Sequence, residues 1–380
     1  TASTGMGKTE AACLWNGAGK LFYTLPLKVS INAIYERLHG TQATEYGFAA
    51  CGLLHSDALN VLWESDNLDE ALTRSKTARL FSYPLTVCTV DQLFTFVYKY
   101  NGSEILPAVL HNANVVIDEI QAYSPDIAAK LIMGLQYLTQ LGGHFTIMSA
   151  TMPPVLTDFM QRKGIPFTNI GPFLTPYIRH VPSFTEGDLD YAAIAEAAKT
   201  HKVLVIVNTV NKADAVYNRL MTLGVNVRVL HARFKRGHRR LLEEAILRFS
   251  RSTDAVGCWV TTQVVEASLD VDFDLLYTEL CPADNLLQRM GRCYRKREYT
   301  ALTPNVRIYD TAEAHSVYRD ELINSRSVEY LLQYCGKPFS EADKCRYVET
   351  VYDAAALRKS AYYAALTKSY NALRDLPVYG

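Results

Sequence analysis

The chain has 380 residues, of which 49% are hydrophobic and 21% are charged, and its formal net charge is zero. This balance is that of an ordinary globular protein and excludes a disordered or fibrous chain. The length is enough for two or three domains with buried cores. Neutrality gives no support to nucleic-acid binding, but it does not exclude it, because a groove that grips a few phosphates can belong to a neutral protein.

The alternation of short apolar runs with longer helical segments predicts parallel sheets with crossover helices. In the first half the expected strands are 21–24, 50–54, 86–89, 115–118 and 145–148. A proline-rich segment at 173–188 predicts a linker between domains 1–172 and 189–311. The alternation then restarts with expected strands at 203–207, 225–230, 256–261, 275–278 and 306–309. From 312 to 380 only helical spacing remains, and we expect this tail to be part of an accessory domain.

The eight cysteines are scattered and form no Cys-x-x-Cys pair. This pattern is typical of reduced thiols in a cytosolic protein and speaks against a disulfide or zinc framework. No apolar run approaches the length of a membrane span, and no signal peptide is recognisable. We therefore expect a cytoplasmic protein without a membrane partner.

Residues 2–9 read Ala-Ser-Thr-Gly-Met-Gly-Lys-Thr, a glycine-rich turn of the kind that opens a helix and points N–H groups at phosphates. In such a loop Lys8 reaches the β- and γ-phosphates of ATP, and the Thr9 hydroxyl is a ligand of Mg²⁺. Further contacts to ATP are expected from Thr4, Gly5, Met6, Gly7 and Glu10. The general pattern has glycine where Ala2 stands, and this variant is similar to the form found in superfamily 2 helicases. A flexible N-terminal turn is the alternative.

A strand precedes such a loop in P-loop folds and lies in the middle of the sheet. In this sequence nothing stands before Thr1 to form it. We therefore expect the sequence to be a fragment that lacks that strand.

Residues 114–121 read Asn-Val-Val-Ile-Asp-Glu-Ile-Gln, an apolar run that ends in two carboxylates at the carboxyl end of a strand. We expect Asp118 to hold Mg²⁺ and Glu119 to orient and deprotonate the attacking water. A polar strand end followed by a turn is the alternative. Ser149 and Thr151 follow the next expected strand, at the place from which such motors couple ATP hydrolysis to domain movement.

Residues 288–295 read Gln-Arg-Met-Gly-Arg-Cys-Tyr-Arg. Arginine stays charged and presents a planar fork to phosphate oxygens, so Arg292 and Arg295 are candidates for stabilising charge in the transition state. Gln288 and Arg289 are expected to position the γ-phosphate or the water, and Asp270 is expected to hold the ribose. Because these residues belong to the second domain, catalysis should depend on closure of the two domains. A solvated basic face is the alternative.

Several motifs together resemble those of the CRISPR-associated helicases of type I interference systems, which are superfamily 2 helicases normally joined to a nuclease. The motifs lie at 89–93, 118–123, 230–234, 262–274 and 286–295, and the resemblance runs from about residue 1 to 309. It implies two tandem RecA-like P-loop domains with parallel sheets in an α/β fold.

The resemblance also implies an ATP-dependent translocase that moves 3′ to 5′ on single-stranded DNA and is recruited by a crRNA-guided surveillance complex. Contacts of the DNA backbone with both domains are expected, because they position a strand without reading its sequence. Carried over from the motifs, these contacts are Pro26, Lys28, Thr89, Asp91, Asn208, Thr209, His231, Arg233 and Thr262. Ordinary surface polarity is the alternative for each of them, and His231 and Arg233 could instead anchor a loop.

The sequence departs from this family in two respects. Gln121 stands where the family usually has histidine, and glutamine cannot carry a charge, so the coupling between ATP and DNA is expected to differ. The family's metal-dependent HD nuclease lies upstream or on a separate chain. No His-Asp dipeptide occurs here, so this chain alone is not expected to cut DNA.

Two rival hypotheses remain. The first is a superfamily 2 helicase that acts on RNA or in chromosomal DNA repair. The second is a non-catalytic module that keeps the fold, which would be expected to have lost some of the residues Lys8, Asp118, Glu119, Gln288, Arg292 and Arg295.

Overall fold

The computed structural model of the chain describes residues 7–17, 19–39, 48 and 50–377. They form two compact α/β units, which we describe separately. Of the described residues, the first unit holds those from Gly7 to Phe173 and from Ala354 to Pro377, and the second holds those from Leu174 to Asp353. Each unit is built on a parallel sheet, so the two-domain α/β fold expected from the alternating pattern is confirmed.

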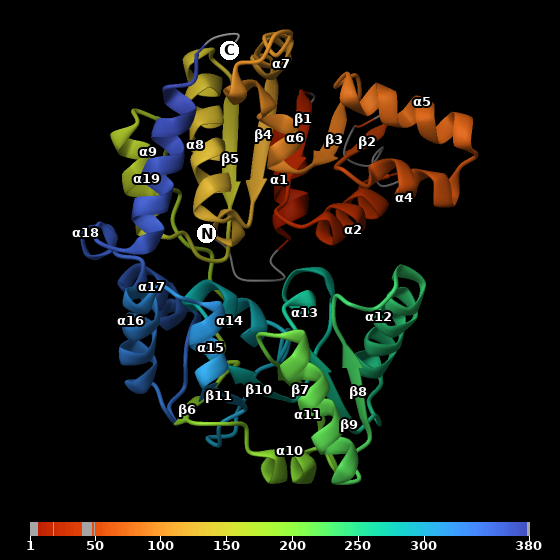
Figure 1. Cartoon of the computed structure of the whole chain (residues 1–380), viewed down its shortest axis with the longest axis vertical. Coiled ribbons are helices and arrows are strands. Elements are labelled where there is room, and N and C mark those ends of the chain that lie inside the picture. Colours follow the sequence, from red (N-terminus) through yellow and green to blue (C-terminus); the bar gives the residue numbers. More distant parts are fainter. Residues whose placement is uncertain (1–6, 18, 40–47, 49, 378–380) are drawn as a thin grey trace. The chain divides into compact units, whose positions relative to one another are not determined.

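The first unit has a five-stranded sheet with the order β2-β3-β1-β4-β5, in which every pairing is parallel. Helices form the crossovers between its strands (Figure 1). The elements are α1 (Lys8–Asn16), β1 (Lys20–Thr24), α2 (Lys28–Leu38), β2 (Cys51–Leu54), α4 (Ala58–Ser65), α5 (Leu68–Arg79), β3 (Leu85–Cys88), α6 (Val90–Leu93), η1 (Thr95–Tyr98), α7 (Ile105–Leu110), β4 (Ala113–Asp118), η2 (Ile120–Ala122), α8 (Pro125–Gln140), β5 (His144–Met148), α9 (Pro154–Arg162), α18 (Ala354–Leu357) and α19 (Ala361–Arg374).

The central strands of this sheet are continuous apolar runs because both of their faces are covered. All four residues of β3 and the last four residues of β1 and of β4 are buried. Such runs are typical of parallel sheets in α/β proteins. The edge strand β5 has no fully buried residue. Since parallel strands all end at one edge, the polar residues after β1, β3 and β4 share that edge, where ligands of such folds bind.

The second unit has a six-stranded parallel sheet with the order β6-β11-β10-β7-β9-β8. Its core includes Val203, Val205, Val260 and Tyr277 from three neighbouring strands. The elements are β6 (Pro182–Glu186), α10 (Tyr191–Ala197), β7 (Lys202–Ile206), α11 (Val210–Thr222), β8 (Val227–Leu230), α12 (Arg236–Arg251), β9 (Gly257–Thr261), α13 (Val264–Ser268), β10 (Leu275–Glu279), α14 (Ala283–Met290), β11 (Val306–Asp310), α15 (Ala312–Val317), α16 (Glu321–Leu332) and α17 (Glu341–Val351).

Strand β6 corrects the expectation of a linker at 173–188. Residues 182–186 pair in parallel with β11 at the edge of the second sheet. The density of prolines in this stretch suggested irregular structure. However, Pro182 is the first residue of an edge strand, a position where the missing N–H of proline breaks no ladder.

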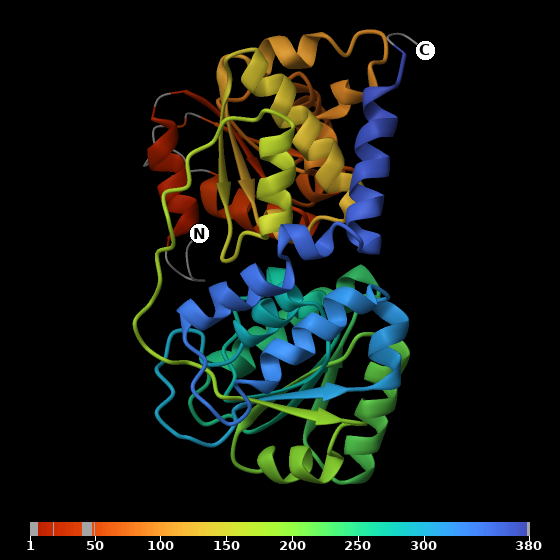
Figure 2. The ribbon, with the colours of Figure 1, turned by 90° about the vertical axis from the view of Figure 1, so that its left-hand side faces the viewer.

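The helical tail from residue 312 onward is divided between the two units. Helices α15 to α17 belong to the second unit, whereas α18 and α19 belong to the first. Figure 2 shows α19 as the long blue helix that runs beside the yellow α8. Tyr370 of α19 donates a hydrogen bond to Gln136 of α8, and its ring meets that of Phe159 in α9 at 5.5 Å. The tail therefore does not form a separate body in the part of the chain that the structure describes.

Candidate functional site

The loop that is expected to bind phosphate ends at α1, where Gly7 is the N-cap residue with φ 75° and ψ 32°. This left-handed conformation strains any residue with a Cβ, so glycine is required there. Lys8 and Thr9 then begin the helix, and Glu10 forms an ion pair with Arg37 of α2. The other expected residues of the loop lie outside the described part of the chain; they are Thr4, Gly5 and Met6.

Lys8 meets the two carboxylates of the acidic motif. Its Nζ lies 3.7 Å from Asp118 Oδ1 and donates a hydrogen bond to Glu119 Oε1. Burial by itself lowers the pKa of Lys8, but the charges of Glu119 and Asp118 outweigh this effect, and the pKa is raised. Lys8 is therefore a cation throughout the neutral range. The structure thus brings together two motifs that lie far apart in the sequence.

Asp118 is held by a residue that sequence reasoning missed. The hydroxyl of Tyr23, which is fully buried in β1, donates to Asp118 Oδ2 at 2.7 Å. Burial and then the charge of Asp118 raise the pKa of Tyr23 well above its usual value, so the hydroxyl stays a donor. A phenol in the otherwise apolar run Leu21–Thr24 was the signal that could have identified it, because a buried tyrosine hydroxyl needs a partner.

The other carboxylate oxygen of Asp118, Oδ1, is suited to be a ligand of a metal ion. Asp118 Oδ1 is buried and has no hydrogen-bond donor among the described residues. Burial raises the pKa of Asp118 to about 6, and the Lys8 ammonium opposes that rise. The Thr9 hydroxyl acts on the pKa of Tyr23 and lowers it, so a second oxygen lies close by. Carboxylate and hydroxyl oxygens suit Mg²⁺, which usually keeps several waters and takes few protein ligands.

Glu119 starts a chain of hydrogen bonds that leaves the acidic motif. It adopts a left-handed conformation with φ 54° and ψ 50°, which costs a residue with a side chain roughly 1–3 kcal/mol. Its carboxylate accepts from Gln121 Nε2 as well as from Lys8. The Ser149 hydroxyl lies 2.5 Å from Gln121 Oε1, and the Thr151 N–H donates to Ser149 Oγ at 3.1 Å. The acidic pair is therefore connected to the segment after β5.

Four residues expected to contact DNA lie at the same edge of the first sheet, after the neighbouring strands β1 and β3. Lys28 is exposed and pairs with Asp57 at 2.7 Å, and Asp91 is exposed and pairs with Lys130 at 3.1 Å. Both side chains are thus at the surface and can exchange these partners for a ligand. The four residues are Pro26, Lys28, Thr89 and Asp91.

In the second unit a buried polar network surrounds Arg289, which is fully buried. Its Nε donates to Glu266 Oε1 at 2.8 Å, and its Nη2 donates to Asn208 Oδ1 at 2.8 Å. Its Nη1 donates to Thr278 Oγ1 at 2.8 Å. Asn208 is tied further by its N–H to Glu279 Oε2 at 2.6 Å. The network joins the ends of β7 and β10 to α13 and α14.

The contacts of Arg289 and Asn208 in this network differ from the roles that we expected for these two residues. Arg289 was expected to position a phosphate or water, and Asn208 was expected to contact DNA. Both side chains are buried, and their polar groups bond to other parts of the second unit. A buried guanidinium must satisfy its donors within the fold. These residues therefore hold the second unit together at this edge.

Of the other two arginines of the motif, Arg292 is buried and Arg295 is half-buried. Arg292 donates to the carbonyls of Leu269, at 2.8 Å, and Glu266. Arg295 has its Nε 2.7 Å from Asp270 Oδ1, so the expected ribose and phosphate ligands pair with each other. The side chain of Asp270 is 58% exposed, which leaves this pair open to exchange with a ligand.

His231 and Arg233 each bond to α11. His231 is buried, its Nε2 lies 3.0 Å from Asp214 Oδ1, and its ring stacks on Phe234 at 4.4 Å. Arg233 is exposed and donates to Asn211 Oδ1 at 2.8 Å. The alternative that these two residues anchor a loop fits both contacts.

The three remaining expected residues lie near the carboxyl ends of strands in the second unit. The Thr209 hydroxyl caps α11 by accepting from the Lys212 N–H at 3.1 Å. Thr262 is buried directly after β9, and Gln288 is half-buried on α14.

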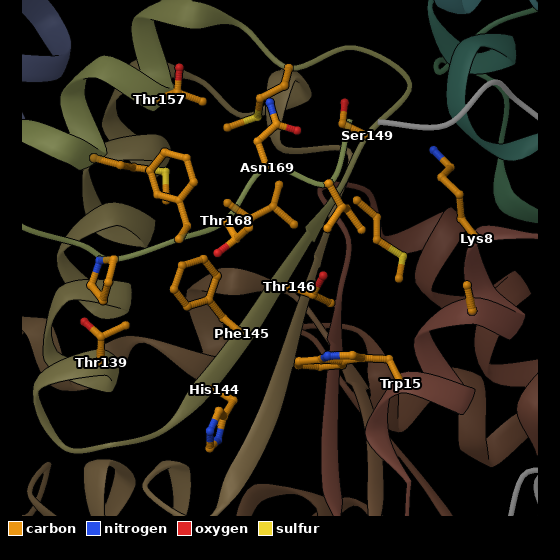
Figure 3. A pocket seen from close by; sticks show the side chains of 18 of the residues that line it. Lys8, Trp15, Thr139, His144, Phe145, Thr146, Ser149, Thr157, Thr168 and Asn169 are labelled. Atoms are coloured by element: carbon orange, nitrogen blue, oxygen red, sulfur yellow. The ribbon is translucent and has the colours of Figure 1, made fainter. Parts of the chain in front are cut away.

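A pocket of about 760 Å³ runs along β5 in the first unit (Figure 3). Lys8 and Ser149 stand at one end of it, but most of its wall is apolar and includes Trp15 and Phe145. An apolar wall does not suit a triphosphate. The pocket therefore differs in character from the charged cluster of Lys8, Asp118 and Glu119.

Within the described ranges, all eight cysteines are free thiols and no group of three or more potential metal ligands occurs. None of the helices in those ranges is long and apolar enough to cross a membrane.

Two family models match the chain. Residues 1–159 match the DEAD/DEAH box helicases, and residues 199–298 match the C-terminal part of the CRISPR-associated nuclease/helicase Cas3. The chain is 31% identical over 366 residues to the CRISPR-associated nuclease/helicase Cas3 of Methanothermobacter thermautotrophicus, with 88% of this chain and 43% of that protein covered.

The fold is also similar to solved structures of this family. Against T. fusca Cas3 with ADP the TM-score is 0.80 at 22% identity, and 99% of this chain and 52% of that chain are covered. Against a chain of a CRISPR RNA-guided surveillance complex before nicking the TM-score is 0.71 at 21% identity, with 99% and 51% covered. The chain spans about half the length of the relatives that it matches. With DEAD/DEAH helicase and Cas3 matches in its two halves, the chain belongs to the Cas3 helicase family and corresponds to the helicase part of those proteins.

Proposed function

We propose that this chain is an ATP-driven motor that moves along single-stranded DNA in CRISPR interference. The observation that carries the proposal is the meeting of Lys8 with Asp118 and Glu119 at the carboxyl edge of the first sheet. A loop lysine, a carboxylate with an oxygen that accepts no hydrogen bond and a second carboxylate beside it are groups of the kind that ATP hydrolysis requires.

Each of these groups has one task in hydrolysis. Lys8 binds the β- and γ-phosphates, together with the loop residues Thr4, Gly5, Met6 and Gly7. Glu10 supports the start of α1 through its ion pair with Arg37. Glu119 accepts the proton of the attacking water. Thr9 and Asp118, which Tyr23 orients, would hold Mg²⁺. When bound, Mg²⁺ neutralises negative charge on the phosphates.

The hydrogen bonds from Glu119 to Gln121, Ser149 and Thr151 give a physical route for coupling. Lys8 contacts Glu119 in the structure and must also serve the phosphates, so nucleotide binding changes the electrostatic field at Glu119. That change passes to the segment after β5 through neutral hydrogen bonds. Gln121 cannot be protonated, so its own link in this route stays uncharged.

The second unit completes the site when the two domains close. Arg292 and Arg295 stabilise charge that develops on the transferred phosphate, and Gln288 positions the water. For this the ion pair between Asp270 and Arg295 opens, and Asp270 then binds the ribose. The single strand contacts residues that follow the strands at the carboxyl edges of both sheets, namely Pro26, Lys28, Thr89, Asp91, Thr209, Arg233 and Thr262. Of these residues Lys28, Asp91 and Arg233 are exposed, Pro26, Thr89 and Thr209 are half-buried, and Thr262 is buried.

A crRNA-guided surveillance complex is the proposed partner, because a structural neighbour belongs to such a complex. A nuclease is the second proposed partner, because the matched relatives are named nuclease/helicases. We propose that cutting of DNA is the task of that nuclease.

The test is ATP hydrolysis by the purified full-length protein with no nucleic acid, with single-stranded DNA and with single-stranded RNA. We expect strong stimulation by DNA, little by RNA, and loss of activity in the Lys8→Ala variant of the order of a hundredfold or more. The matched control is Lys28→Ala, a change of another lysine at the same edge, which should weaken stimulation by DNA and keep basal hydrolysis.

Two outcomes would contradict the proposal. Equal or greater stimulation by RNA would favour a helicase that acts on RNA. No hydrolysis from folded protein under any condition would favour a non-catalytic module.

A further inference from the structure

A cluster of buried charged side chains lies in the second unit, outside the residues assigned above. Arg179 and His180 precede β6, and Glu341 and Lys344 come from the first turn of α17. All four are at least nine-tenths buried. Arg179 donates to Glu341 Oε1 from Nη2 at 2.6 Å and from Nε at 3.2 Å, and Lys344 Nζ donates to the same oxygen. Buried charges require such mutual pairing, so the cluster has a defined geometry.

Two branches of hydrogen bonds lead from this cluster to the arginine motif. Arg179 Nη1 donates to the Arg295 carbonyl at 3.0 Å. Lys344 Nζ lies 2.7 Å from His180 Nδ1, and His180 Nε2 lies 2.8 Å from the Cys293 carbonyl. Because a carbonyl only accepts, His180 Nε2 carries the proton and Nδ1 accepts from Lys344.

The two carbonyls flank a backbone position that needs such support. Tyr294, between them, has φ 47°, which is unusual for a residue with a side chain. A conformation of this kind persists only where surrounding contacts fix it. The Arg295 N–H adds a bond to Asp272 Oδ1 at 3.0 Å. The Cys293–Arg295 turn is therefore held by two of its carbonyls and by one N–H.

We infer that Arg179, His180, Glu341 and Lys344 are positioning residues for ATP hydrolysis, which set the Cys293–Arg295 turn and so the direction of the Arg295 side chain. The inference rests on the proposed function, since it takes Arg295 as the group that stabilises phosphate charge. Both branches start at the carboxylate of Glu341, which accepts hydrogen bonds from Arg179 and from Lys344. Loss of its charge releases Arg179 and Lys344 together.

The test compares Glu341→Gln with Arg346→Ala, each measured for DNA-stimulated ATP hydrolysis and thermal unfolding. Arg346 is the matched control, because it lies on the same helix in an exposed pair with Asp343. We expect Glu341→Gln to lower kcat by about tenfold or more, with the KM for ATP changed by less than about threefold. The control should keep both values.

A double variant separates positioning from stability. In an Arg295→Ala background, Glu341→Gln should cause no further loss of kcat, because both changes remove the same contribution. If Glu341→Gln fails to fold, His180→Gln and His180→Phe take its place. Glutamine can donate to the Cys293 carbonyl and accept from Lys344, so His180→Gln should retain kcat, whereas His180→Phe should lower it.

Each other outcome has a definite meaning. A Glu341→Gln protein as active as the control overturns the inference, and so does an equal loss of kcat with and without Arg295. A wild-type protein without DNA-stimulated hydrolysis overturns the proposed function itself, and the inference with it.

Discussion

Arg289 is the residue whose role differs most from its motif. It donates hydrogen bonds to the side chains of Glu266, Thr278 and Asn208, and none of its surface is exposed. Burial lowers the pKa of a guanidinium, but here the neighbouring groups, Cys281 and Glu266 foremost, raise it further above its usual value. The charge is therefore permanent and internal to the second unit.

We predict that Arg289→Met lowers the free energy of unfolding by about 3–5 kcal/mol, because it leaves Glu266 buried without its ionic partner. Denaturant unfolding of the variant measures this loss. Arg297→Ala is the control. Arg297 pairs with Asp272 and Asp274 at the surface, and its side chain is 42% exposed, so the cost should be below about 1 kcal/mol. Equal losses in the two variants would contradict the assignment.

The motifs could not give the partners of the residues that they single out. Lys8, Asp118 and Glu119 lie together in the structure, and each stands at a secondary-structure boundary that the sequence marks. Arg289 looked like a phosphate ligand because its partners come from distant segments that no local pattern connects to it. Tyr23 was missed for the same reason, since its hydrogen bond to Asp118 appears only when β1 and β4 pair.

At the scale of elements, helix α14 is tied to α17 by a buried acid. Asp284, in the first turn of α14, accepts a hydrogen bond from Tyr352 at the C-cap of α17. Burial raises the pKa of Asp284 to about 6 from a usual value of 3.8, with the Tyr352 hydroxyl opposing the rise and Glu266 adding to it. The charged form is therefore less favourable in the folded protein than in the unfolded chain.

We predict that Asp284→Asn becomes more stable than wild type as the pH rises. A raised folded-state pKa contributes stability below pH 3.8, which is lost as the pH rises through about 6. Asparagine keeps an acceptor for Tyr352 and carries no charge. The difference in free energy of unfolding between variant and wild type should therefore grow from about pH 4 to about pH 6 and then level off. A constant difference over this range would rule out Asp284 as the titrating group.

Most of the strands could be predicted from their apolar runs, with ends shifted by a residue or two. The exception, β6, has only one pairing strand and two half-exposed and two exposed residues, so it lacks a continuous apolar signal. The division of the tail could not be predicted either. Helical spacing shows that α19 has an apolar face, but it does not say which sheet unit that face packs on.

At the scale of the whole chain, the polypeptide passes from the first unit to the second after Phe173 and returns after Asp353. The returning segment buries Leu366, Tyr370 and Leu373 of α19 within the first unit. Lys99 Nζ donates to the Leu376 carbonyl at 2.7 Å, which fastens the end of the segment. The last residues are thus a structural part of the unit that carries Lys8 and the acidic pair.

We predict that removal of residues 354–380 destabilises the first unit selectively. Each of the three large buried side chains contributes roughly 1.5–3 kcal/mol, so their loss should expose α8 and α9 to solvent. Hydrogen exchange measures this as faster exchange in α8 and α9, with exchange in β7, β9 and β10 unchanged. Tyr370→Ala should give the same pattern more weakly, and Lys368→Ala, an exposed position on the same helix, should not. Faster exchange spread evenly over both units would mean that the tail stabilises the chain as one cooperative body, and the division into two units would then fail.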